Sequence, residues 1–134
     1  MTTGFKIVSV IGAVLFALFT SVQFNDVTQY DTAQWLTYCW ILGYAIMAAL
    51  CFAALLKKPL PSKGYLTLAL IVFALAIFRF TQIDWSEPLF CILRPEGDTK
   101  GNPAGNETGG LLILTIYLTL MWVFAKRNER ASNS

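Results

Sequence analysis

The chain contains no histidine and few charged residues. Of its 134 residues, 13% are Asp, Glu, Lys or Arg, whereas soluble domains have roughly a quarter. The apolar fraction of 56% and the mean hydropathy of +0.58 are equally unlike a soluble domain. A soluble globular protein is therefore excluded. The missing histidine also excludes haem or metal ligation by imidazole and acid–base catalysis by imidazole.

Other signals of chemistry are missing as well. No serine or cysteine has a base beside it, and no cofactor or metal-ligand motif is present. The net charge is only +2 and the basic residues do not alternate with aromatics, so nucleic acid is not an expected partner. Cys39 and Cys51 lie about 18 Å apart along one predicted helix and cannot bridge. For Cys39 and Cys91, the sequence is compatible both with a disulfide between them and with two free thiols.

Four apolar runs are long enough to cross a bilayer, which takes about 20 residues per helix. Membrane strands would alternate in polarity, and lipid offers no partners to a free backbone, so these runs should be helices. A cleaved signal peptide is the alternative for the first run, but Thr20 to Gln23 gives a poor cleavage site. The sequence predicts an all-α integral membrane protein, one domain over residues 1–134, built as an antiparallel four-helix transmembrane bundle with helices near 7–24, 35–56, 65–83 and 110–125.

The charges predict an orientation, because Lys and Arg in short loops stay on the cytoplasmic side. Seven of the ten basic residues flank one end of the helices, and seven of the eight acidic residues flank the other. Both termini should be cytoplasmic, in the plasma (inner) membrane if the source is bacterial. Residues 84–109 then form a long extracytoplasmic loop. Its segment 85–93 is apolar and should lie at the interface, and the remainder should lack regular structure.

The end of the first helix carries the first candidate site residues. Gln23 falls on the helix face that also carries Ser9, which we expect to face the other helices. A buried amide needs hydrogen-bond partners, because leaving it unpaired costs about 1–3 kcal/mol. Asn25 and Asp26 follow directly. A solvated turn explains those two residues equally well.

Three further polar residues lie at the same end of the predicted bundle. Arg79 is inside the third helix, on the same face as Gln82. An intramembrane Arg pairs with an acid or lifts its guanidinium to the headgroups. Its candidate partners are Asp26, Asp84 and Glu107. Glu107 should open the fourth helix, where the helix dipole favours an acid.

The stretch Phe16-Ala17-Leu18 followed by Val22-Gln23-Phe24-Asn25-Asp26 resembles the signature of the transmembrane protein 220 family. An aromatic-rich second helix, and Glu107 followed by Gly109 ahead of the last helix, extend the similarity. The chain departs from the family pattern at Val27, where a proline is expected, and in a longer first outer loop. The resemblance implies a multi-pass membrane protein without an assigned activity, and it marks Gln23, Asn25 and Asp26 as residues of interest.

Three functions are compatible with this pattern. The first is binding of a cation or small polar ligand in an outward-facing acidic pocket formed by Gln23, Asn25, Asp26, Arg79, Gln82 and Glu107. The second is an accessory subunit of a larger membrane complex or a homo-oligomer, which docks through small residues spaced four apart, such as Ala13 and Ala17, or Ala45 and Ala49. The third is an intramembrane enzyme that uses a carboxylate as acid or base. No cofactor or bound metal is expected.

Overall fold

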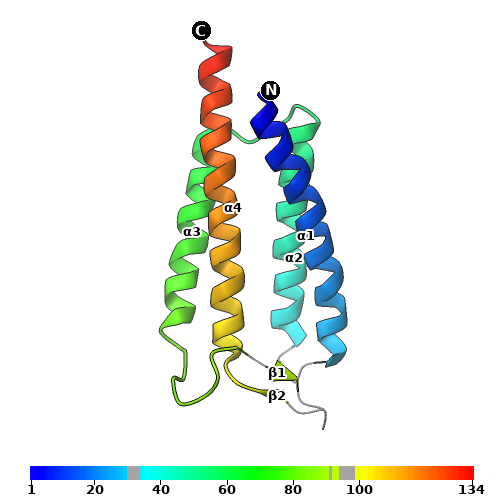
Figure 1. Ribbon diagram of the computed structural model, residues 1–134, viewed down its shortest axis with the longest axis vertical. Helices are drawn as coiled ribbons and strands as arrows, with labels where there is room; N and C mark the ends of the chain where they lie inside the picture. Colours follow the sequence, from blue (N-terminus) through cyan, green and yellow to red (C-terminus); the bar gives the residue numbers. More distant parts are fainter. Residues whose placement is uncertain (30–33, 91, 94–98) are drawn as a thin grey trace.

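The computed structural model describes residues 1–29, 34–90, 92–93 and 99–134, and it describes side chains at 1–24, 38–90 and 101–134. These residues form four helices and two very short strands (Figure 1). In chain order the elements are α1 (Thr3–Gln29), α2 (Gln34–Leu55), α3 (Ser62–Phe80), β1 (Ile92–Leu93), β2 (Thr99–Lys100) and α4 (Pro103–Ser132).

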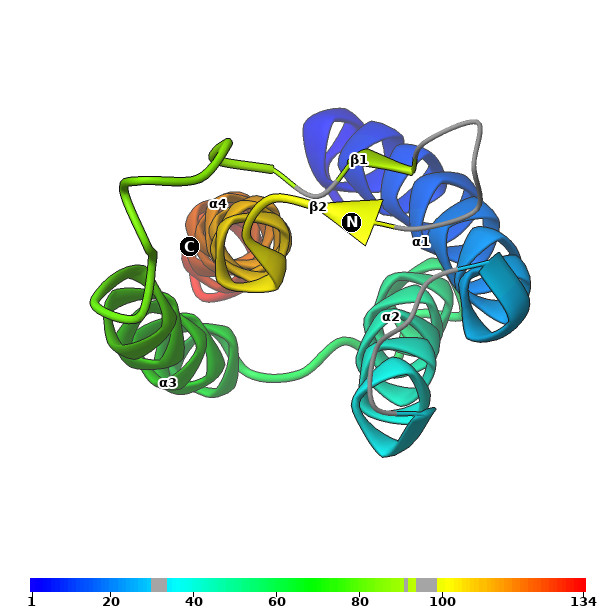
Figure 2. The same ribbon diagram turned by 90° about the horizontal axis from the view of Figure 1, so that it is seen from below.

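Each of these four helices is long and apolar enough to cross a membrane. They form two antiparallel hairpins, α1 with α2 and α3 with α4, and the hairpins meet chiefly where α1 lies against α4 (Figures 1 and 2). The predicted bundle of four apolar membrane helices is thus confirmed. Both termini lie at the end that carries the α2–α3 turn, and the long α3–α4 loop lies at the other end (Figure 1).

Two helices are longer than the apolar runs predicted. α1 continues to Gln29, so positions 25 and 26 belong to its helical backbone and not to a turn after it. α4 begins at Pro103, well before Gly110, and continues to Ser132. Proline fits this start because the first helical residue needs no donor N–H. Part of the loop predicted to lack regular structure is therefore helix, and Thr99–Lys100 pairs antiparallel with Ile92–Leu93.

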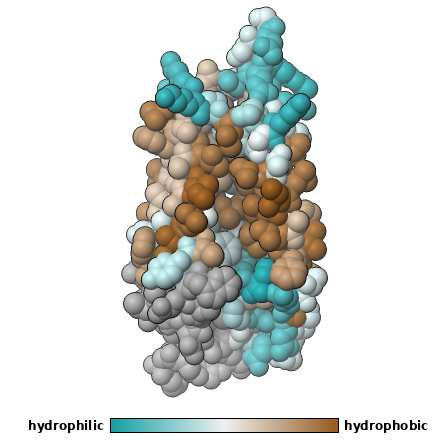
Figure 3. Space-filling model, turned by 180° about the vertical axis from the view of Figure 1, so that it is seen from behind, coloured by the Kyte–Doolittle hydropathy of each residue, from teal (hydrophilic) through white to brown (hydrophobic). Residues whose placement is uncertain are grey.

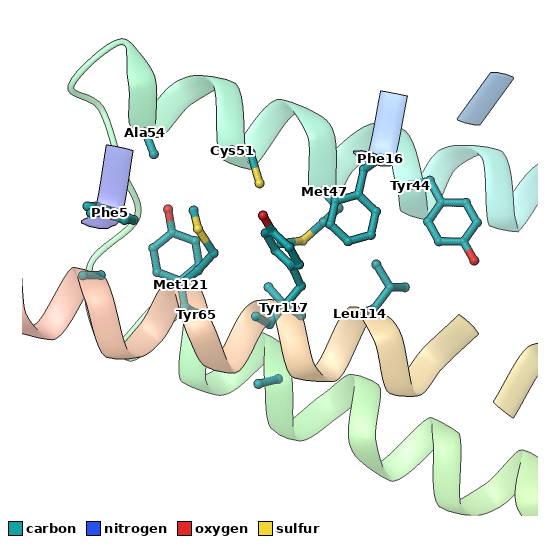
Figure 4. Packing of buried hydrophobic residues seen from close by; sticks show 13 residues of the cluster. Phe5, Phe16, Tyr44, Met47, Cys51, Ala54, Tyr65, Leu114, Tyr117 and Met121 are labelled. Atoms are coloured by element: carbon teal, nitrogen blue, oxygen red, sulfur yellow. The ribbon is translucent and has the colours of Figure 1, made fainter. Parts of the chain in front are cut away.

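The core takes residues from all four helices, with Tyr65 from α3, and is rich in aromatic rings (Figure 4). The Phe16 ring stacks on Tyr44 and meets Tyr117 edge to face, with centroids 5.0 Å apart in the second pair. The Tyr117 hydroxyl donates a 2.5 Å hydrogen bond to the carbonyl oxygen of Val8. Gly12 lets the helices approach there, because a Cβ atom would lie 2.5 Å from the Tyr117 ring and 2.6 Å from the Cys51 sulfur.

The outer surface matches a membrane environment. Apolar side chains cover the middle of the face in Figure 3, and polar ones gather toward both ends. Many large apolar side chains are exposed along the helices, as expected where lipid is the solvent. Ala17 of α1 and both Ala45 and Ala49 of α2 are also exposed, so these small residues do not pack inside the bundle.

One acid lies at the basic end of the bundle, and the structure gives it a partner. The α3 helix starts after Pro61, whose apolar ring carries no acceptor that could cap the first backbone N–H groups. Glu129 of α4 takes that role. Its carboxylate accepts hydrogen bonds from the backbone N–H and the hydroxyl of Ser62, both 2.7 Å long. The last turns of α4 therefore hold the start of α3.

Candidate functional site

An ion pair joins α3 to α4 at the loop end of the bundle. The Nε atom of Arg79 contacts the carboxylate of Glu107, and the side chains are 28% and 9% exposed. Arg79 also donates a hydrogen bond from its Nη1 atom to the side-chain oxygen of Gln82, three residues further along. Of the two possibilities for Arg79, pairing and snorkelling, the structure shows pairing. Glu107 neutralises a charge that would otherwise be costly inside an apolar layer.

The position of Glu107 differs from the prediction. Because α4 starts at Pro103, Glu107 lies in the second turn of the helix and not in the first. The helix dipole acts mainly within the first turn, so it does not account for a buried acid at this position. The contact with Arg79 does.

The long loop is attached to the start of α4 by Asn102, whose side chain is buried. Its amide oxygen accepts a 2.8 Å hydrogen bond from the backbone N–H of Asp84. Its amide nitrogen donates to the carbonyl oxygens of Asp84 and Pro88, at 2.8 and 2.9 Å. The backbone N–H of Asn102 also donates to Pro88. One side chain thereby satisfies backbone groups at two points of the loop.

Two glycines let this loop lie directly on the helix start. Gly101 adopts a φ of +107°, a left-handed conformation that favours glycine, and a Cβ atom there would collide with the Phe90 carbonyl. A Cβ atom on Gly105 would collide with the Leu89 carbonyl. The loop runs beside the start of α4 toward α1 (Figure 2), and Phe90 lines a cavity together with residues of α1, α2 and α4.

Phe90 forms part of the wall of a cavity of about 450 Å³ that is open to the outside of the bundle. Its walls come from α1, α2, α4 and the loop. Most lining side chains are apolar or aromatic, and two carry amides. The lining residues are Phe19, Val22, Gln23, Tyr44, Phe90, Asn106, Gly109, Gly110 and Ile113.

The structure divides the six candidate residues. It brings Arg79, Gln82 and Glu107 together between α3 and α4. It places Gln23 in the wall of the cavity between α1, α2 and α4. The side chains of Asn25 and Asp26 lie outside the described residues, as does Cys91, so their contacts stay predictions.

Sequence reasoning missed Asn102 and Asn106 as site residues. Their signal was weak, because both lie in a stretch rich in Gly, Asn and Pro that is typical of a loop. Asp84, one candidate partner of Arg79, has local partners of its own. Its carboxylate accepts hydrogen bonds from the Ser86 hydroxyl at 2.6 Å and the Ser86 backbone N–H at 3.0 Å. These two bonds hold the pKa of Asp84 below its ordinary value.

The four long apolar helices in the described part of the chain, with an intramembrane ion pair between α3 and α4, define an integral, multi-pass membrane protein. The particular family follows from the sequence. The model of the family described as "Transmembrane family 220, helix" matches residues 15–123, and the chain belongs to this family. No curated protein and no solved structure matches the chain.

Proposed function

We propose that this protein binds a small ligand with an apolar body and one polar end, at the loop end of the bundle. The observation that carries the proposal is the cavity beneath Phe90. Its volume of about 450 Å³ falls in the range of roughly 300–1,000 Å³ that is usual for small-molecule sites. Such sites combine mostly apolar walls with a few polar groups that orient the ligand. Gln23 supplies an amide for that purpose.

The contacts of Glu107 favour such a ligand over a bare cation. A cation site needs several oxygen ligands whose charge is available. The Glu107 carboxylate already balances Arg79. Within the described ranges, no three Cys, Asp or Glu side chains gather in a group that could hold a metal ion. The walls of the cavity, with Phe19 and Ile113 among them, suit hydrocarbon instead.

The test is to fill the cavity. A Cβ atom at Gly109 would meet only the Phe90 ring, at an ordinary 3.7 Å, so Gly109→Leu should occupy the space without moving the backbone. Gly43→Leu is the matched control, because a Cβ atom there meets nothing within 4 Å. Native mass spectrometry of the protein extracted in mild detergent should show a retained small molecule in wild type and Gly43→Leu, and its loss in Gly109→Leu. Equal retention in all three proteins would overturn the proposal.

We propose the cytoplasmic side for both termini, and the plasma membrane if the source is bacterial. In support, the end with both termini and the α2–α3 turn carries Lys6, Lys57, Lys58, Lys63, Lys126, Arg127 and Arg130. A fluorescent protein that matures only in the cytoplasm should fluoresce when it is fused after Ser134. A dark fusion with full expression would reverse the orientation.

A role as a subunit of a larger membrane complex is the second candidate function. It is favoured by the exposure of Ala45 and Ala49, which give α2 a smooth outer surface suited to another helix. Replacing both with leucine should abolish co-purification of a partner protein. If these alanines contact only lipid, the replacement should have no effect. Unchanged co-purification would remove this candidate.

A further inference from the structure

Two side chains that line the cavity are also exposed on the outside of the bundle. Val22 and Ile113 are 53% and 41% exposed. Both belong to helices that are long and apolar enough to cross the membrane. In a bilayer, exposed side chains on such helices contact acyl chains. The mouth between α1 and α4 therefore faces lipid.

Polarity changes along the depth of the cavity. The α1 helix runs toward the loop end, so Gln23 is the outermost of its lining residues and Phe19 the innermost. The α4 helix runs in the opposite direction, so Asn106 is outermost and Ile113 innermost. Both amides thus lie toward the loop end, where Phe90 of the loop is also part of the lining, and Phe19 and Ile113 lie deeper. A lipid in the adjoining leaflet has the same order, with polar groups outside and a chain inside.

The space exists because α4 lacks side chains at this depth. Gly109 and Gly110 are consecutive and both line the cavity. Gly110 must stay small, since a Cβ atom there would lie 2.8 Å from the Tyr44 hydroxyl and 2.9 Å from the Trp40 ring. Gly109 has no such neighbour, since a Cβ atom there meets only Phe90. Its missing side chain leaves room that an extended chain can fill.

We infer that the occupant is one acyl chain of an ester-linked phospholipid from the leaflet next to the loop, which enters between α1 and α4. The ester carbonyl accepts a hydrogen bond from the Gln23 amide, and the chain lies along Phe19 and Ile113. This inference rests on the proposed function and names the class of its ligand. Because the chain leaves one apolar environment for another, the hydrophobic effect adds little. The preference for this lipid comes from the hydrogen bond to its ester carbonyl and from the fit of its chain to the cavity.

Photolabelling in a bilayer tests the inference. The full-length protein is placed in phosphatidylcholine vesicles that contain a small fraction of phosphatidylcholine with a diazirine on one acyl chain. After irradiation, mass spectrometry compares labelling of Phe19, Val22 and Ile113 with that of Leu70 and Ile71, which are exposed on α3. We expect several-fold more label in the cavity. Gly109→Leu should reduce it to the α3 level, Gln23→Leu should reduce it in part, and Gly43→Leu should leave it unchanged.

An ether-linked diazirine lipid of the same chain length is the second probe. It lacks the carbonyl acceptor, so it should label the cavity less than the ester does, and it should label α3 equally. Cavity labelling no higher than on α3, or unaffected by Gly109→Leu, would overturn the inference. The proposed function survives that result if native mass spectrometry finds a non-lipid molecule that Gly109→Leu releases. It fails too if no molecule is released.

Discussion

The carboxylate of Glu107 on α4 contacts the guanidinium of Arg79 on α3, and both side chains are largely withdrawn from solvent. Gln82 takes a second donor of the same guanidinium. The pair lies at the end of the bundle where the long loop returns to α4. It therefore fastens the second hairpin close to the point where the loop is attached by Asn102.

Removing one member of the pair should destabilise the protein more than removing both. Glu107→Gln leaves the Arg79 charge without its carboxylate, and Arg79→Leu leaves a buried carboxylate without a cation. Each should lower the free energy of unfolding by about 1–3 kcal/mol. The double variant Arg79→Leu/Glu107→Leu buries no charge and should recover part of that loss. Unfolding in detergent measures all three.

The control for the ion pair is Glu87→Gln, which removes an exposed acid from the loop and should change stability by less than about 0.5 kcal/mol. Losses in the two single variants that simply add in the double variant would show that Arg79 and Glu107 are not coupled.

Asn102→Asp should release the loop although it changes the shape of the side chain very little. The aspartate can still accept the hydrogen bond from the Asp84 N–H, but it cannot donate to the carbonyl oxygens of Asp84 and Pro88. Its charge would also face those two oxygens. Hydrogen exchange should become at least several-fold faster over residues 84–90 and remain slow in α1. Asn133→Asp, at the exposed end of α4, is the control, and equal protection in both variants would contradict the role of Asn102.

The sequence predicted the four helices because each needs about 20 apolar residues in a row, whereas the strands of a membrane barrel would alternate in polarity. The ends of α4 were harder to predict. Its start contains Gly105, Gly109 and Gly110, residues that lower helix propensity and indicate a loop when they are read locally. The reasons for these glycines are tertiary. Gly105 leaves space for the Leu89 carbonyl, Gly109 for the cavity, and Gly110 for the side chains of Tyr44 and Trp40.

The sequence predicted which kinds of residue form the site but not which of them lie next to each other. An Arg within an apolar helix needs a compensating group, and that expectation led to three acids, among which Glu107 contacts Arg79. Spacing along a single chain does not specify which helices become neighbours. For this reason Gln23 was assigned to the same pocket as Arg79, whereas it lines a cavity among α1, α2 and α4. The sequence does not mark Asn102, because its partners are backbone groups of Asp84 and Pro88 that only the folded loop brings to it.

Glu129→Ala should loosen the start of α3 from a distance of 67 residues along the chain. The carboxylate accepts from both the N–H and the hydroxyl of Ser62, and Pro61 offers no replacement. The first turn of α3 should exchange its amide hydrogens faster, with a smaller drop in Tm than for Glu107→Gln because Glu129 is exposed. Glu129→Gln keeps one acceptor and should have a weaker effect. Arg130→Ala is the neighbouring control, and an effect of equal size there would indicate a general change in charge.

Gly12 and Gly43 give a matched test of how closely the helices pack. A Cβ atom on Gly12 would lie 2.5 Å from the Tyr117 ring and 2.6 Å from the Cys51 sulfur, in two different helices, whereas one on Gly43 meets nothing within 4 Å. Gly12→Ala should therefore cost about 1–3 kcal/mol, the usual cost of overpacking a core. Gly43→Ala should be neutral or slightly stabilising, because alanine is the better helix former. Parallel melting curves in detergent compare the two variants. If both variants melt at the same temperature, α4 can move away from α1 at little cost. The packing between these two helices is then looser than the contacts of Gly12 indicate.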